Sequence, residues 1–167
     1  MIPLEEAQNY VLDRVFQLSE EKLDISSAYS RVTAEVVTSK ELVPPFDNTA
    51  VDGYAVKAAD TDGATEANEV TLEVVGSIPA GVQPDFEIQH GQSARIMTGA
   101  PLPKGADAVV MVEWTNASDN ENIVRVNRSV KNGDHIRKAG EDLCPDDQVI
   151  DQGTSLTPAH IGLLAGV

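Results

Sequence analysis

Apolar residues recur at helical spacing near the N-terminus of the chain. If residues 3–18 form a helix, one face carries the whole apolar stripe: Leu4, Ala7, Val11, Val15 and Leu18. Pro3 suits the first helical position, and Glu5 and Glu6 lie where the positive end of a helix dipole favours acids. The pattern therefore predicts an amphipathic helix over 3–18, with its stripe packed in a core or an interface.

Two shorter helices are predicted further along the chain. Residues 26–34 favour a short second helix capped by Asp24 or Ser26, and 35–38 then become strand-like. Near the C-terminus, Thr157 suits a cap and Pro158 a first turn, so a helix of about two turns should precede Gly166.

The middle of the chain has the pattern of short strands. Apolar and β-branched runs lie at 70–76, 94–98, 108–112 and 123–127, each bounded by Gly, Pro, Asn or Asp. Polar segments at 60–69 and 115–122 are expected to be exposed loops. We therefore expect a mainly β protein with flanking α elements, in which a β-rich domain (46–139) is inserted into a split α+β domain (1–45 and 140–167).

Composition narrows the class of protein. The 167 residues carry 27 acids against 12 bases, for a formal net charge of −15, which argues against a nucleic-acid binder because such proteins need a basic face. No apolar run approaches the roughly 20 residues of a membrane span, and the N-terminus lacks the basic and apolar regions of a signal peptide. With one cysteine, Cys144, no internal disulfide can form. We expect a cytoplasmic protein with no membrane partner.

The segment PPFDNTAVDGYAV (44–56) crowds polar groups just before a predicted strand. Asp52-Gly53 is a strong turn dipeptide, and Asp47, Asn48 and Thr49 can bond nearby backbone, so an Asx-type turn is one interpretation. A single turn does not need two carboxylates, an amide and a hydroxyl. Such a cluster can also hold Mg²⁺ through one or two carboxylates, with water and a substrate phosphate completing the shell.

Two further segments have candidate chemistry. In 93–107 a predicted strand ends at Thr98 and Gly99, where backbone N–H groups and a hydroxyl could meet an anion, or could simply form a tight turn. In IRKAGED (136–142), Arg137 could bind a phosphate or pair with Glu141 or Asp142. Each pattern alone leaves both interpretations open.

Other sites are poorly supported. The three histidines, at 90, 135 and 160, have no acid or cysteine at zinc-like spacing, and we expect them to be surface or structural residues. We interpret Cys144, next to Pro145, as an incidental thiol.

Taken in order, these segments resemble the molybdopterin molybdenumtransferase family, which includes the E domain of gephyrin. The matching segments are PPFDNTAVDGYAV (44–56), RIMTGAPLPKGADAVVMVE (95–113), IRKAGED (136–142) and GTSLTPAHIGLLAGV (153–167). Thr49 stands where the family usually has serine, and Val51 where methionine is common. The resemblance implies the family's N-terminal region of coiled, bifurcated β-sheets.

The resemblance also implies an activity. The family inserts molybdate, its substrate, into the dithiolene of adenylylated molybdopterin, with Mg²⁺ as cofactor and release of AMP. Residue by residue, the catalytic positions would be Asp52, Thr98 and Asp142, with Asp52 a candidate metal ligand. The substrate-binding positions would be Asp47, Asn48, Thr49, Gly99, Arg137 and Glu141.

Family members continue past the closing segment into a pterin-binding domain and a small β domain. The resemblance thus covers the family's N-terminal half, and in the family's homodimer the cleft lies between this region and the later domains of the other subunit. We expect the 167-residue chain to be inactive alone. The alternatives are a scaffold or dimerisation module that has lost the chemistry, and a generic Mg²⁺-dependent phosphate-handling domain.

Overall fold

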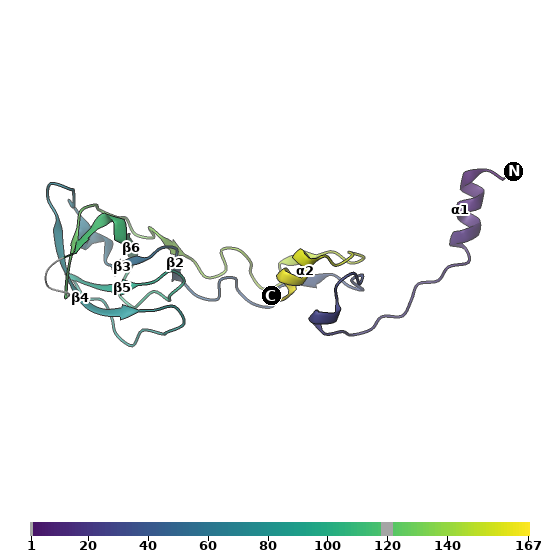
Figure 1. Cartoon of the computed structure of the whole chain (residues 1–167), viewed down its shortest axis with the longest axis horizontal. Helices are drawn as coiled ribbons and strands as arrows, with labels where there is room; N and C mark the ends of the chain where they lie inside the picture. Colours follow the sequence, from purple (N-terminus) through teal and green to yellow (C-terminus); the bar gives the residue numbers. More distant parts are fainter. Residues whose placement is uncertain (1, 118–121) are drawn as a thin grey trace. The chain divides into compact units, whose positions relative to one another are not determined.

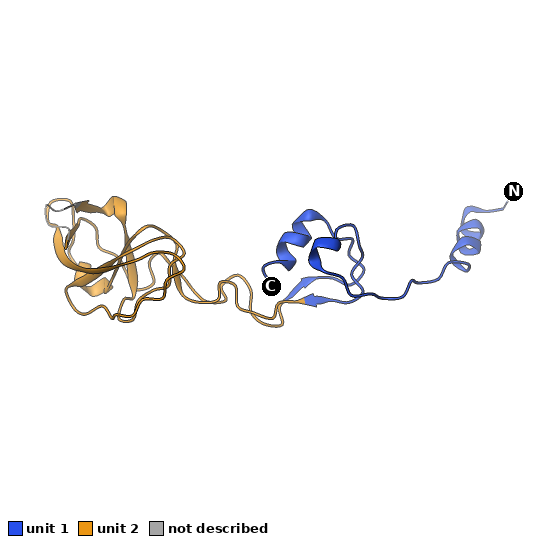
Figure 2. Ribbon diagram, turned by 60° about the horizontal axis from the view of Figure 1, so that its bottom comes forward, with its two compact units in different colours: residues 1–37, 148–166 blue, residues 38–147, 167 orange. Residues whose placement is uncertain are grey.

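The structure is a computed structural model that describes residues 2–117 and 122–167. It divides into two compact units (Figure 2). One unit comprises residues 1–37 and 148–166, and the other residues 38–147 with residue 167. The domain bounds expected from the sequence, 1–45, 46–139 and 140–167, stay a prediction.

The first unit holds both α-helices, α1 (Leu4–Leu12) and α2 (Pro158–Leu164), and the 3₁₀ turn η1 (Ile25–Ser27). The short strands β1 (Val37–Thr38) and β10 (Gln148–Ile150) pair at its boundary. The predicted start of α2 is confirmed: Pro158 is its first residue, and the Thr157 N–H donates to His160 Nδ1 at 3.1 Å.

The N-terminal helix is shorter than the predicted 3–18. It ends at Leu12, and Val15 and Leu18 lie beyond it with exposures of 61% and 80%. Within α1 no residue is buried, and Leu4 is 74% exposed. Because most helical stability comes from packing of the apolar face, a stripe without a packing partner does not extend the helix.

The helix predicted over 26–34 is wrong beyond its first turn. Ser30 has a φ of 62°, which interrupts a right-handed helix. Its N–H and that of Thr33 donate to the carbonyls of Leu156 and Thr154, at 2.9 and 3.0 Å. The segment is extended there because its backbone pairs with 154–156, a partner that local sequence does not reveal.

The second unit contains a six-stranded sheet, and the prediction of a mainly β protein is confirmed (Figure 1). The strand order is β6-β3-β5-β4-β8-β7, with only β4 and β5 parallel. The bounds are β3 Gly53–Val56, β4 Val70–Ile78, β5 Gln92–Ile96, β6 Ala108–Met111, β7 Thr115–Ala117 and β8 Ile123–Val126. Each of the four predicted strand runs forms a strand.

Both faces of this sheet are buried across β3, β5 and β6, whereas β4 and β8 alternate between buried or half-buried and exposed residues. Val56 and Val110 pack on one side with Leu72, whereas Ala55 and Val109 pack on the other, because side chains alternate along each strand. Aliphatic residues fill both clusters, as the low aromatic content of 4% requires.

Two predicted loops contain ordered structure. The segment 115–122 begins with β7, and its positions 118–121 lie outside the described residues. The segment 60–69 begins inside the 3₁₀ helix η2 (Ala58–Thr61), and Thr61 and Ala64 are buried rather than exposed. In the described part of the chain, no helix has the length and apolarity needed to cross a membrane. A cytoplasmic location stays a prediction.

Candidate functional site

Three segments far apart in the sequence meet beside a two-residue strand, β2 (Asn48–Thr49). On one side β2 pairs antiparallel with β9 (Ile136–Arg137), and Asn48 is opposite Arg137. On the other side the Thr49 N–H donates to the Ala100 carbonyl at 3.1 Å, and the Gly99 N–H donates to the Thr49 carbonyl at 2.9 Å. The fold therefore brings the segments 44–56, 93–107 and 136–142 together within the second unit.

Asp52 is held at one oxygen and open at the other. Its Oδ1 accepts hydrogen bonds from the Thr98 backbone N–H and hydroxyl, at 2.8 and 2.7 Å. The Thr98 N–H, then its hydroxyl, and more weakly the charge of Arg95 hold the pKa of Asp52 below its usual range. Within 2–117 and 122–167, no donor is hydrogen-bonded to Oδ2. The carboxylate is therefore ionised, oriented and able to take one more partner.

Gly53 fixes the backbone beside this carboxylate. A Cβ at this position would lie 2.0 Å from the Val110 carbonyl oxygen on β6, so no side chain fits. The Val112 N–H donates to the Asp52 carbonyl at 3.0 Å, which ties the same turn to the end of β6. The turn Asp52-Gly53 is thus a structural requirement as well as the site's support.

Asp47 joins the first and third segments. Its Oδ2 accepts a hydrogen bond from Lys138 Nζ at 2.7 Å, and its Oδ1 accepts from the Ala139 N–H at 2.9 Å. The hydrogen bond from Lys138, followed by that from Ala139, lowers the pKa of Asp47. Both oxygens are occupied within the fold. Sequence reasoning missed Lys138 as the partner, although it lies inside the quoted segment 136–142.

Arg137 is paired with acids of its own loop. Its Nε donates to Glu141 Oε1 at 2.6 Å, and its Nη2 donates to Asp142 Oδ2. The bond from Arg137 lowers the pKa of Glu141, while the same acids raise the pKa of Arg137. Of the two interpretations open for Arg137, the structure contains the ion pair. Its side chain is still 43% exposed, so other donors face solvent.

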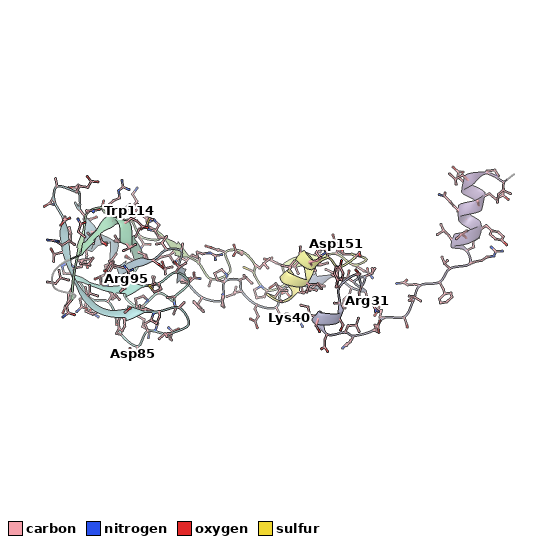
Figure 3. The ribbon with its side chains drawn as sticks, in the orientation of Figure 1. Arg31, Lys40, Asp85, Arg95, Trp114 and Asp151 are labelled. Carbon is pink, nitrogen blue, oxygen red and sulfur yellow. The ribbon has the colours of Figure 1, made fainter. Side chains whose placement is uncertain are left out.

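Asn48 and Thr49, the two residues of β2, are buried, with exposures of 6% and 0%. Asn48 Nδ2 donates to the Phe46 carbonyl at 3.1 Å, and the Thr49 hydroxyl donates to the Val51 carbonyl at 2.7 Å. At the second segment, the N–H groups of Thr98 and Gly99 are both occupied internally. An anion at this turn would therefore have to be held by other donors. Arg95, labelled in Figure 3, is a cation whose charge acts on Asp52.

The histidines have structural contacts. His90 Nδ1 pairs with Asp60, His135 Nδ1 donates to the Val109 carbonyl at 2.7 Å, and His160 accepts at the start of α2. Cys144 is exposed, and its Sγ lies 3.4 Å from the Gly140 carbonyl oxygen.

A magnesium ion fits this site only in part. Across the described ranges, no group of three or more His, Cys, Asp or Glu side chains could enclose a metal. Asp52 Oδ2 supplies a single open carboxylate oxygen. That is compatible with Mg²⁺, which commonly binds through one or two carboxylates and keeps water and substrate phosphate as its remaining ligands.

The fold and site define a mainly β region in which Asp52 is an oriented carboxylate with one open oxygen, and in which the loop 136–142 carries an ion-paired Arg137. The chain belongs to the family described as the MoeA N-terminal region (domain I and II), which matches residues 2–167. The predicted family resemblance is thereby confirmed.

Similar proteins carry this region as part of a longer chain. The chain is 39% identical over 166 residues to a molybdopterin molybdenumtransferase of Bacillus subtilis (strain 168), covering 98% of this chain and 39% of the relative. It is 38% identical to molybdopterin molybdenumtransferase 2 of Mycobacterium tuberculosis, covering 100% and 41%. The crystal structure of a molybdopterin biosynthesis moeA protein from Pyrococcus horikoshii OT3 superimposes with a TM-score of 0.89 at 36% identity, covering 99% and 43%. The chain thus spans about 40% of the length of these relatives.

Proposed function

We propose that this chain forms one wall of the active site of a molybdopterin molybdenumtransferase, which inserts molybdate into adenylylated molybdopterin with release of AMP during molybdenum cofactor biosynthesis. One observation carries the proposal: two of the family segments meet at an Asp52 carboxylate whose Oδ1 is fixed by Thr98 and whose Oδ2 has no bond to the described residues, and the third segment pairs with the neighbouring strand β2. The name of the related proteins, molybdopterin molybdenumtransferase, supports a role in molybdenum transfer to molybdopterin, and the adenylylated substrate and AMP release are part of the proposal.

Asp52 would hold the Mg²⁺ ion or a water molecule through Oδ2. Thr98 holds Oδ1 of that carboxylate with two hydrogen bonds, which lower the pKa of Asp52. When bound, Mg²⁺ neutralises charge on the adenylate phosphates during hydrolysis. Positioned charges of this kind are effective because they do not need to reorganise as the reaction proceeds.

The third segment presents a group of charged side chains and is joined to the first segment by the pairing of β2 with β9. Asp142 is the third catalytic position of the proposal, and it holds Arg137 together with Glu141. Arg137 keeps donors free for a substrate phosphate while two of its nitrogens are fixed. The surface that faces the substrate would also include Asp47, Asn48, Thr49 and Gly99. Most of their polar groups are hydrogen-bonded within the fold.

The wall is incomplete without the later domains of the relatives, which in the homodimer would come from the other subunit. We therefore propose that the 167-residue chain does not insert molybdenum alone. The acidity of the chain is compatible with this arrangement, because the bound metal and the later domains can supply the positive charge.

A non-catalytic scaffold or dimerisation module is the second candidate. The observation that favours it is that both oxygens of Asp47 and the side chains of Asn48 and Thr49 are bonded inside the fold, as in a purely structural junction.

A chimera separates the two functions. Residues 2–167 replace the matching region of the Bacillus subtilis relative, and molybdenum insertion and AMP release are assayed with adenylylated molybdopterin, molybdate and Mg²⁺. A catalytic wall gives an active chimera and an inactive isolated chain. A chimera that is folded and dimeric but without AMP release supports the scaffold, and activity of the isolated chain contradicts the composite site.

A further inference from the structure

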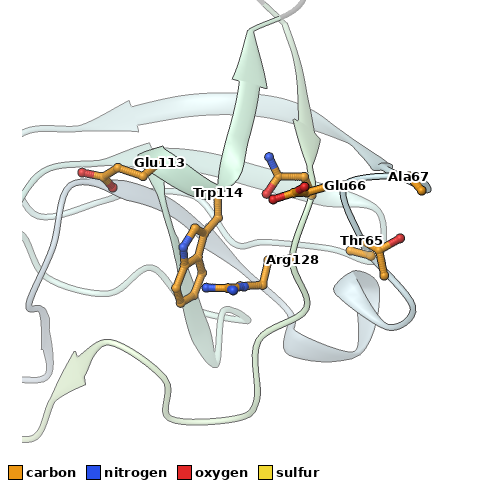
Figure 4. A pocket seen from close by; sticks show the side chains of 8 residues that line it. Thr65, Glu66, Ala67, Glu113, Trp114 and Arg128 are labelled. Carbon is orange, nitrogen blue, oxygen red and sulfur yellow. The ribbon is translucent and has the colours of Figure 1, made fainter.

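A second concave site lies in the second unit, apart from the residues assigned above. Its volume is about 570 Å³, and three separate segments line it (Figure 4). Trp114 comes from the 3₁₀ turn η3 (Val112–Trp114), Asn127 and Arg128 follow β8, and residues 64–67 follow η2. The volume is large enough for a small ring compound.

The walls of this cavity are fixed by backbone bonds. The Asn127 N–H donates to the Trp114 carbonyl at 3.0 Å, which joins two of the three segments. In the third, Thr65 and Asn68 exchange two backbone hydrogen bonds of 3.0 Å, and Trp114 packs against the hydrophobic core. A site that exists before its ligand arrives loses little ordering entropy on binding.

Its floor is the Trp114 ring with the Arg128 guanidinium lying over it, so that a ligand ring would stack on the guanidinium. The Arg128 guanidinium carbon lies 4.7 Å from the Trp114 ring centroid, and the His135 ring packs at 5.1 Å with a tilt of 59°. An indole face and a guanidinium plane both stack well with flat heterocycles.

The polar groups around this floor are available. Where the structure describes the chain, no hydrogen bond or ion pair engages the side chains of Glu66, Glu113, Asn127 or Arg128. Figure 4 shows Glu66 on the side of the indole where Arg128 lies and Glu113 turned the other way. Carboxylates accept from amino groups, and the Asn127 amide can both donate and accept.

Charge decides between a ring and a phosphate. Two carboxylates and one guanidinium line the cavity, and the whole chain has a formal charge of −15. A free phosphate would therefore meet net repulsion, whereas a neutral ring with amino groups would not. We propose that this cavity binds a planar, amino-bearing heterocycle of the purine or pterin type, stacked on the Trp114–Arg128 pair.

The single tryptophan makes the test specific, because the ¹⁵N-labelled chain gives one indole N–H signal. Adenosine, pterin and ribose 5-phosphate are each titrated to about 10 mM, a range that detects millimolar affinity. We expect a saturable shift of the indole signal with at least one ring compound and none with ribose 5-phosphate. Comparison of adenosine with pterin shows which ring is preferred.

Two matched variants localise the effect. Arg128→Gln should weaken ring binding about 5-fold through loss of the guanidinium plane, while Lys131→Gln, with the same charge change on the same loop, should leave it unchanged. No saturable shift with either ring, a shift produced equally by ribose 5-phosphate, or a ring affinity unaffected by Arg128→Gln would each overturn the proposal. The readout is binding alone, so it is independent of the transferase proposal.

Discussion

Substitution of Gly53 by alanine tests the link between the sheet and the candidate site. The added Cβ would lie 2.0 Å from the Val110 carbonyl oxygen, whereas ordinary contacts begin at 3.4 Å, so β3 and β6 must separate by roughly 1.4 Å. The obstacle is the backbone of Val110, which cannot rotate away as a side chain can. The preceding residues of β6, Ala108 and Val109, are fully buried.

Overpacking of this kind costs about 1–3 kcal/mol, and the upper end applies because backbone must move. A loss of about 3 kcal/mol corresponds to a fall in melting temperature of about 6–12 °C for a chain of this size. Urea unfolding followed by the fluorescence of Trp114 gives the free energy directly, since this single tryptophan packs on the core of the second unit.

Gly76→Ala is the matched control in the same sheet. Its Cβ would meet only the Phe86 ring, at 2.9 Å, and a side chain can move, so the cost should stay below about 1 kcal/mol. The reasoning is refuted if Gly53→Ala loses less than about 0.5 kcal/mol, or no more than Gly76→Ala.

Three further outcomes are expected. Thr98→Val removes the hydroxyl bond to Asp52, so the pKa of Asp52 measured by ¹³C NMR should rise; an unchanged value would contradict the assigned geometry. The lowered pKa of Asp52 adds stability to the fold above the unfolded-state pKa of about 4, and this added stability is lost as the pH falls through the folded-state pKa. Thr98→Val has less of it to lose, so its free energy of unfolding should fall less below about pH 4. Lys138→Met should likewise raise the pKa of Asp47, with Lys138→Arg restoring it, and equal pKa values in both variants would exclude the ion pair as the cause. Leu72→Ala, at a side chain 2% exposed, should cost about 2–5 kcal/mol in urea unfolding, and a cost under about 1 kcal/mol would remove Leu72 from the core.

The strands were predictable because burial of a sheet leaves a local pattern. Short runs such as 108–112 are apolar throughout, and both faces of β6 are indeed buried. The two helix predictions failed where contacts with distant parts of the chain determine the local structure. The backbone of 30–33 pairs with 154–156 instead of forming a helix, and α1 ends at Leu12 because its apolar face is not buried against any of the residues that the structure describes.

The candidate site was likewise predictable from the sequence only in part. The residue types that gather around β2 were identifiable from three polar segments, but their meeting depends on contacts between positions 46 and 92 residues apart, as in Asp52–Thr98 and Asp47–Ala139. Spacing along the chain cannot give such contacts. Nor can it show which polar groups the fold itself occupies, as it does for Thr49 and Asp47.

Replacement of Asp52 by alanine in the Bacillus chimera tests the central claim most directly. Asp85→Ala, at an exposed acid elsewhere in the second unit (Figure 3), is the control for the loss of one negative charge. With adenylylated molybdopterin, molybdate and Mg²⁺, Asp52→Ala should lower the rate of molybdenum insertion by about 100-fold or more, the size typical of a lost electrostatic contact in an active site, while Asp85→Ala keeps the parental rate. Parental insertion by a folded Asp52→Ala chimera would contradict the account.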